Sequence, residues 1–154
     1  MKISSKALLF AASLILSVPA LAHSNAYLDS LQAPHGGQLR MSGPYHMELV
    51  VSTPGELTAY VTDHGDAPQM TAGAEGVAKV KNGKKEISVK LEPAGENMLK
   101  GKGEFKVNAK TVVVVFLKMA GKDAEGFEFT PLKPKAKTKG KATQSGSAGH
   151  HGHH

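Results

Sequence analysis

Short runs of alternating apolar and polar residues follow one another along the middle of the chain. Residues 87–91 read Ile-Ser-Val-Lys-Leu, which is the period of a strand with one buried face. Turn-forming residues such as Gly43-Pro44 and Asn82-Gly83 separate these runs. The pattern predicts strands at residues 38–42, 45–52, 55–63, 75–82, 85–92, 98–105, 111–119 and 126–132.

Two details of the pattern bear on the architecture. Val112 to Leu117 are apolar at every position, which favours a central strand covered on both faces. Asn82-Gly83 between two strand-like runs is the strongest hairpin signal in the chain. Seven or eight short strands in about 100 residues predict an all-β fold, a small immunoglobulin-like two-sheet sandwich, with a small barrel as the alternative.

The amino-terminal segment has the composition of an export signal. Lys2 and Lys6 precede an apolar run from Ala7 to Val18, and the small-residue sequence Ala20-Leu21-Ala22 follows. The run is shorter than the roughly 20 residues that span a bilayer. We therefore expect residues 1–22 to be a Sec-type signal peptide cleaved after Ala22, and the protein to be periplasmic.

The rest of the chain divides by composition. Residues 23–36 are expected to be loosely structured and residues 37–132 to form the sandwich domain. Residues 133–154 are rich in Lys and His and contain no aromatic residue, so they are expected to form a disordered tail. The pattern leaves open whether the histidines at the end of the tail are natural or a purification tag.

Charge and composition exclude several classes of function. Residues 23–132 carry 12 basic and 13 acidic side chains, so no nucleic-acid partner is expected, whereas the Lys-rich tail suits contact with an anionic membrane surface. No nucleophile elbow, HExxH motif or phosphate-binding glycine motif occurs, and the chain has no cysteine. The protein is therefore not expected to be an enzyme, and any metal must be held without thiolates.

Histidines are the candidate chemistry of the predicted sheet. In the strand at 45–52, His46 and Glu48 share the face opposite the core, while Met47 points inward. If the turn at 53–55 pairs Val51 with Leu57, His46 lies opposite Thr62 and diagonal to His64, about 7 Å away. One copper, nickel, cobalt or zinc ion can bridge such a pair, and the equally open alternative is an ordinary polar sheet face.

Other residues extend this metal hypothesis. Asp63 and Asp66 flank His64 and can supply oxygen ligands or outer hydrogen bonds. His35 fits poorly, because a tight hairpin at Gly43-Pro44 places it near Val51, about 17 Å from His46. Cleavage after Ala22 would make His23 the first residue, whose amino group and imidazole can together chelate copper.

The extreme carboxyl end offers a second, looser metal-binding segment. Its four histidines can wrap an ion without a fixed geometry, and they are His150, His151, His153 and His154. The methionines, in contrast, are scattered without a Met-x-x-Met repeat and are expected to serve as packing residues.

Three stretches, residues 33–37 (APHGG), 45–51 (YHMELVV) and 60–64 (YVTDH), resemble small periplasmic domains associated with heavy-metal efflux. Such domains occur in or beside the periplasmic adaptor subunits of metal-exporting resistance pumps. The resemblance covers roughly residues 33–105 and implies that His35, His46 and His64 contact metal. A weaker likeness, to exported copper-resistance β-sandwich chaperones, rests on size, export, strand pattern and the placement of His23.

Together these features predict a periplasmic metal-binding protein. It would bind copper or a divalent transition metal and buffer the ion or deliver it to an efflux adaptor or pump. The alternative is a non-catalytic interaction module that docks on an envelope protein or a membrane surface and has no folded metal site.

Overall fold

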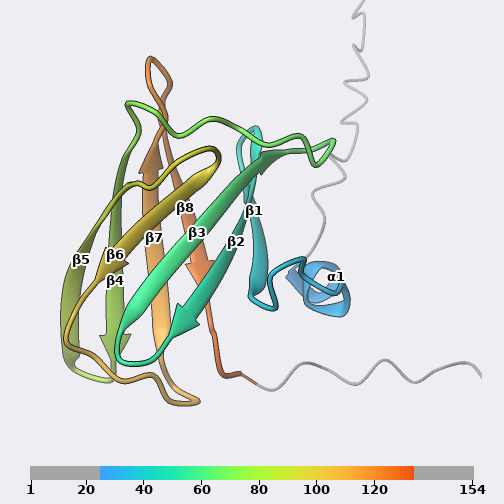
Figure 1. Ribbon diagram of the computed structural model, residues 1–154. Coiled ribbons are helices and arrows are strands. Elements are labelled where there is room, and N and C mark those ends of the chain that lie inside the picture. The colour runs from blue at the N-terminus through green and yellow to red at the C-terminus, as the bar shows by residue number, and fades with distance from the viewer. Residues whose placement is uncertain (1–24, 134–154) are drawn as a thin grey trace, which may run out of the picture.

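The computed structural model describes residues 25–133, which form one short helix and eight strands (Figure 1). The elements are α1 (Asn25–Ser30), β1 (Gln38–Ser42), β2 (Tyr45–Ser52), β3 (Glu56–Asp63), β4 (Glu75–Asn82), β5 (Lys85–Pro93), β6 (Met98–Lys102), β7 (Val112–Lys118) and β8 (Ala124–Phe129). Each of the eight predicted strands is present. None of the helical structure in this range is long and apolar enough to cross a membrane.

All eight strands pair antiparallel in one sheet, in the order β1-β2-β3-β6-β5-β4-β7-β8. The link between β5 and β6 consists of only two residue pairs, Glu92 with Lys100 and Pro93 with Leu99. The sheet therefore bends there into two halves of four strands that face each other, and the predicted all-β class is confirmed.

Side chains bring together the two outer strands, β1 and β8, so the sheet is nearly closed. Arg40 Nε donates a hydrogen bond to the Glu128 carbonyl (2.9 Å), and the Gln38 side-chain oxygen accepts one from the Thr130 amide (2.7 Å). Ser42 Oγ donates to a Glu125 carboxylate oxygen (2.8 Å). These bonds protect both edges from pairing with another chain.

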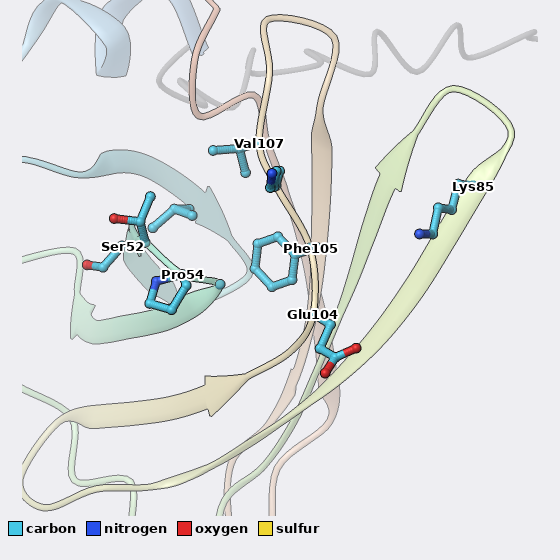
Figure 2. A pocket seen from close by; sticks show the side chains of 10 residues that line it. Ser52, Pro54, Lys85, Glu104, Phe105 and Val107 are labelled. Atoms are coloured by element: carbon cyan, nitrogen blue, oxygen red, sulfur yellow. The ribbon is translucent and has the colours of Figure 1, made fainter.

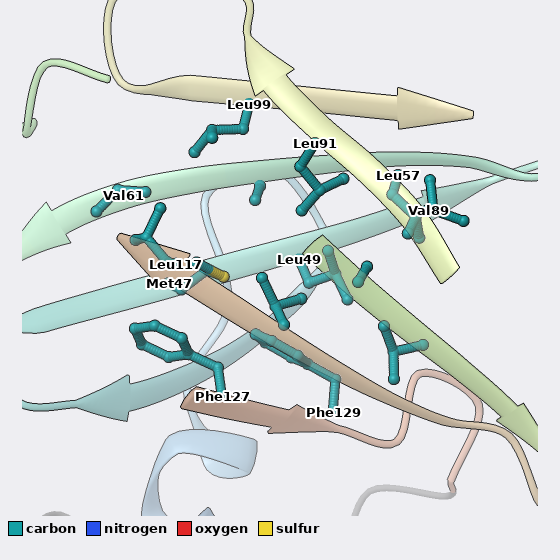
Figure 3. Close-up of a cluster of buried hydrophobic side chains, with 14 of the residues drawn as sticks. Met47, Leu49, Leu57, Val61, Val89, Leu91, Leu99, Leu117, Phe127 and Phe129 are labelled. Atoms are coloured by element: carbon teal, nitrogen blue, oxygen red, sulfur yellow. The ribbon is translucent and has the colours of Figure 1, made fainter. Parts of the chain in front are cut away.

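The core lies between the two halves and follows the strand alternation. Met47, Leu57 and Leu99 project from one half, and Leu117 and Phe129 project from the other (Figure 3). Burying each such side chain contributes about 1.5–3 kcal/mol. The predicted inward face of β2 and β3 is confirmed, because these residues are buried: Tyr45, Met47, Leu49, Leu57, Ala59 and Val61.

Two-residue turns set the register of two hairpins. Ser42 pairs with Tyr45 across Gly43-Pro44, and Asn82 pairs with Lys85 across Gly83-Lys84. Gly83 has φ +60°, a conformation that glycine adopts without a steric penalty. Both hairpins are therefore as tight as their turn residues predict.

The strand β7 departs from its prediction. It lies between β4 and β8, but only Val113, Val115 and Leu117 are buried. Phe116 is 46 % exposed, so the outer face of this strand is not covered as the continuous apolar run suggested. In an antiparallel sheet a central strand needs cover on one face only, and apolar residues on its outer face are tolerated.

The segment expected to be loosely structured contains the helix α1 and is attached to the sheet. Leu28 and Ala33 are buried, and the Asp29 carboxylate forms an ion pair with the buried Arg40 guanidinium (2.7 Å). Residues 25–36 therefore lie over the end of β1, as Figure 1 shows for α1. One buried leucine and one ion pair order a segment whose composition lacks a helical repeat.

Candidate metal centre

The outer face of β1, β2 and β3 carries the candidate residues. The predicted pairing of Val51 with Leu57 is confirmed, and it places His46 opposite Thr62 and Glu48 opposite Tyr60. Directly opposed residues of antiparallel strands point to the same side. His46, Glu48 and Tyr60 therefore share one face of the sheet, away from the core.

His46 and His64 lie together, as the strand register predicted. Their ring centroids are 4.8 Å apart and the rings are inclined at 72°. Two imidazoles that bind one tetrahedral ion through nitrogens at about 2.0–2.1 Å have centroids about 5 Å apart. The centroid separation of this pair is therefore compatible with binding of one ion by both rings.

Hydrogen bonding fixes the orientation of the His64 ring. His64 Nε2 lies 2.9 Å from the Gly43 carbonyl, which only accepts hydrogen bonds, so Nε2 carries a proton. In the neutral ring Nδ1 then has a lone pair for a metal. The β1–β2 turn thus holds His64 over the end of β2, beside His46.

His35 lies elsewhere than the hairpin register suggested. The chain does not continue β1 backward past Gln38 but turns at Gly36, which has φ +75° and donates its amide to the Ala33 carbonyl (3.1 Å). The His35 ring then stacks on Tyr60, with centroids 3.6 Å apart and parallel planes (0°). The prediction that His35 lies near Val51, far from the site, is therefore wrong.

Glu48 fixes His35 in this position. Its carboxylate is 4 % exposed and accepts hydrogen bonds from the His35 amide (2.8 Å), the Gly37 amide (2.9 Å) and His35 Nδ1 (2.8 Å). Since Nδ1 is the donor, Nε2 of the neutral ring has the free lone pair. A carboxylate behind an imidazole is the usual outer partner of a metal-binding histidine.

All three histidines line one cavity of about 500 Å³ between α1 and the outer sheet face. Tyr27, Leu28 and Leu31 of the amino-terminal segment form the opposite wall. Within residues 25–133, no group of three or more His, Asp or Glu side chains stands close enough to hold an ion as arranged. The cavity therefore offers a close histidine pair with a third imidazole in its wall.

The two aspartates beside His64 take different places. Both oxygens of Asp63 accept hydrogen bonds within the following loop, from the Gly65 amide (2.8 Å), the Ala67 amide (2.9 Å) and the Gln69 side chain (3.3 Å). Asp66 is 90 % exposed, with one oxygen 3.7 Å from His46 Nδ1. Asp63 thus shapes the loop, and Asp66 is the carboxylate that faces the histidine pair.

Several predicted features lie outside the described residues. They are the signal peptide at 1–22, His23, and the tail with His150, His151, His153 and His154. The structure therefore leaves the amino-terminal copper chelate and the tail site as predictions.

A second depression lies beside the β2–β3 turn (Figure 2) and has a volume of about 610 Å³. The Phe105 ring lies between Pro54 and the strand that carries Lys85. Val51 and Val107 also line it, and its charged side chains are Lys85, Glu104 and Lys106. This depression is lined by no imidazole and by only one carboxylate, so it contains too few ligands for a metal ion.

Sequence reasoning placed Tyr60 on the outer face with His64 but missed its stacking on His35. It also missed Met41, which the tight β1–β2 turn places opposite His46. The turn residues contained that information, because Ser42 opposite Tyr45 puts Met41 opposite His46. No such signal existed for the wall formed by residues 27–31.

Comparison of the chain with protein-family models, with curated proteins and with solved structures finds no match. The resemblance to domains of metal-efflux systems stays a prediction.

Proposed function

We propose that the protein is a periplasmic metal-binding protein that holds copper, nickel, cobalt or zinc in the cavity of His35, His46 and His64. It then buffers the ion or delivers it to an efflux system. The observation that carries the proposal is the contact between His46 of β2 and His64, which directly follows β3; their ring centroids are 4.8 Å apart. Imidazole is a ligand common to these metals.

The arrangement around the pair supports the same function. His35 has its Nδ1 engaged by Glu48, and His64 has its Nε2 engaged by the Gly43 carbonyl. Each ring therefore has one nitrogen fixed by the protein and the other left with a lone pair, which is how metal-binding histidines are usually held. The His46 side chain is 15 % exposed and that of His35 is 46 % exposed, so the cavity is open to an entering ion.

Export of the protein is proposed from residues 1–22, which combine two lysines, an apolar run and a small-residue cleavage site. The tail histidines are proposed as a loose collecting segment that raises the local concentration of metal near the folded site. No enzymatic step is proposed.

Metal titration tests the folded site. The parent protein for the test is the full chain with His150, His151, His153 and His154 changed to alanine, so that tail binding does not contribute. We expect one Ni(II), Zn(II) or Cu(II) ion per chain to bind to it with a Kd of micromolar or below. His46→Ala and His64→Ala should each weaken this binding at least about ten-fold, a loss that even an outer partner of a metal ligand can cause.

The control is Gln32→Ala, which changes the wall of the same cavity without removing an imidazole. Unchanged affinity in His46→Ala and His64→Ala would overturn the folded site. If the tail-substituted parent binds no metal at all, the interaction module becomes the better description of the domain.

A further inference from the structure

The strand β1, which pairs with β2, carries a candidate third ligand for the histidine pair. Met41 pairs directly with His46 in the β1–β2 register. Directly opposed residues have Cβ atoms about 4.5–5.5 Å apart and point to the same face. The half-buried Met41 side chain therefore lies on the outer face beside the imidazole of His46, on the side opposite Thr62.

His64 approaches the same place from the other direction. Its Nε2 donates to the carbonyl of Gly43, only two residues after Met41 in the turn that joins β1 to β2. The His64 ring also contacts the His46 ring, in an edge-to-face arrangement. Met41 and His64 are thus both neighbours of His46, Met41 by the strand register and His64 by the contact between the rings.

The other methionines differ from Met41 in their surroundings. Met47 is fully buried in the core and Met119 is 7 % exposed, so both are packing residues as predicted. Met98 is half-buried and opposite Tyr60, and Met70 is 66 % exposed in a loop. Met41 is the methionine that the strand register places directly beside a cavity histidine within residues 25–133.

We propose that Met41, His46 and His64 form a binding site for the cuprous ion, Cu(I). This inference rests on the proposed function and specifies its metal. A thioether is a soft ligand that selects Cu(I) over zinc, nickel and cobalt, and imidazole also binds copper. The Met41 thioether would be the third ligand beside the two imidazoles, because among residues 25–133 no three His, Asp or Glu side chains are grouped closely enough to hold an ion.

A Met41→Leu variant tests the site, because leucine keeps the volume and apolar character of methionine and removes the sulfur. Cu(I) affinity is measured anaerobically in the full chain with the four tail histidines changed to alanine, by competition with bicinchoninate. We expect Met41→Leu to weaken Cu(I) binding by at least about ten-fold and to leave Zn(II) affinity unchanged. X-ray absorption at the copper edge should show a sulfur neighbour in the parent and none in the variant.

Met98→Leu is the matched control, since it removes a half-buried sulfur from the same sheet face but opposite Tyr60 rather than His46. It should bind Cu(I) as the parent does. Cu(I) affinity that is equal in Met41→Leu and parent, together with loss of binding in His46→Ala, would overturn the thioether ligand and leave a histidine site. Failure of the parent to bind Cu(I), Zn(II), Ni(II) or Co(II) would overturn the proposed function itself.

Discussion

Glu48 connects the segment that carries His35 to the strand β2. It is the buried carboxylate of β2, and it accepts three hydrogen bonds from the segment at 35–37. A buried carboxylate is costly unless such donors surround it. Glu48 therefore stabilises the turn at Gly36 and, through His35 Nδ1, the orientation of the His35 ring.

Glu48→Gln should loosen this arrangement. The amide keeps the shape of the side chain but loses the negative charge, and its NH₂ group replaces one acceptor with a donor. We expect the free energy of unfolding to fall by about 1–3 kcal/mol, as for removal of a partner of buried charged hydrogen bonds. Urea denaturation monitored by circular dichroism measures this change.

The control for this substitution is Glu128→Gln, which makes the same chemical change on the exposed face of β8. It should leave the unfolding midpoint within experimental error, since exposed substitutions are usually worth less than about 0.5 kcal/mol. Equal midpoints for the two variants would contradict the role of Glu48.

Among the elements, the β1–β2 hairpin contributes most to the candidate site. Its tight turn places Met41 opposite His46 and presents the Gly43 carbonyl to His64. This geometry was readable from the sequence, because Gly43-Pro44 marks the turn and the strand period sets the faces. The eight strands and the His46–His64 contact were predicted on the same local rules.

The path of residues 25–37 could not be predicted from turn residues and strand period. It depends on the burial of Leu28 and on contacts between distant residues, namely Asp29 with Arg40, and His35 with Tyr60 and Glu48. A strand register extrapolated beyond Gln38 places His35 wrongly, because the Gly36 backbone reverses the chain. Local periodicity contains no information about such tertiary contacts.

Arg40 of β1 links the segment at 25–37 to the other edge strand, β8. Its removal should therefore weaken both the attachment of α1 and the contact between β1 and β8. The side chain is 6 % exposed; it pairs with Asp29 (2.7 Å) and donates to the Glu128 carbonyl (2.9 Å). Arg40→Met keeps the apolar stem and removes the guanidinium. We expect a loss of about 1.5–3 kcal/mol in unfolding free energy, with faster amide hydrogen exchange in α1.

Lys100→Met, on the exposed face of β6, serves as the comparison and should change neither quantity. The double variant Arg40→Met with Asp29→Asn should lose less unfolding free energy than the two single variants together, because each single change already breaks the same ion pair. Full additivity would mean that the pair contributes nothing to the attachment of α1.

At the scale of the whole molecule, the two halves of the sheet share one core but only two pairs of residues in the backbone ladder at β5–β6. The halves therefore depend on side-chain packing for their relative position. Because the apolar side chains of both halves fill the same interior, the domain should unfold in a single transition.

Close approach at the junction of the halves depends on Gly101 in β6. A Cβ atom at this position would lie 2.3 Å from the Lys90 carbonyl oxygen and 2.8 and 2.9 Å from side-chain carbons of Leu91 and Val89. The first contact is with backbone and cannot be relieved by rotating a side chain. Gly101 therefore permits β6 to cross β5 where the sheet bends.

Gly101→Ala should accordingly destabilise the domain by about 1–3 kcal/mol, the usual cost of overpacking. Gly126→Ala is the matched control, because a Cβ atom there would lie 3.8 Å from the Phe116 ring, an ordinary contact. Urea midpoints from far-ultraviolet circular dichroism should fall for Gly101→Ala and stay unchanged or rise slightly for Gly126→Ala. A Gly101→Ala protein as stable as the parent would show that the β5–β6 corner can widen without cost, and the halves would then be less tightly coupled than their shared core implies.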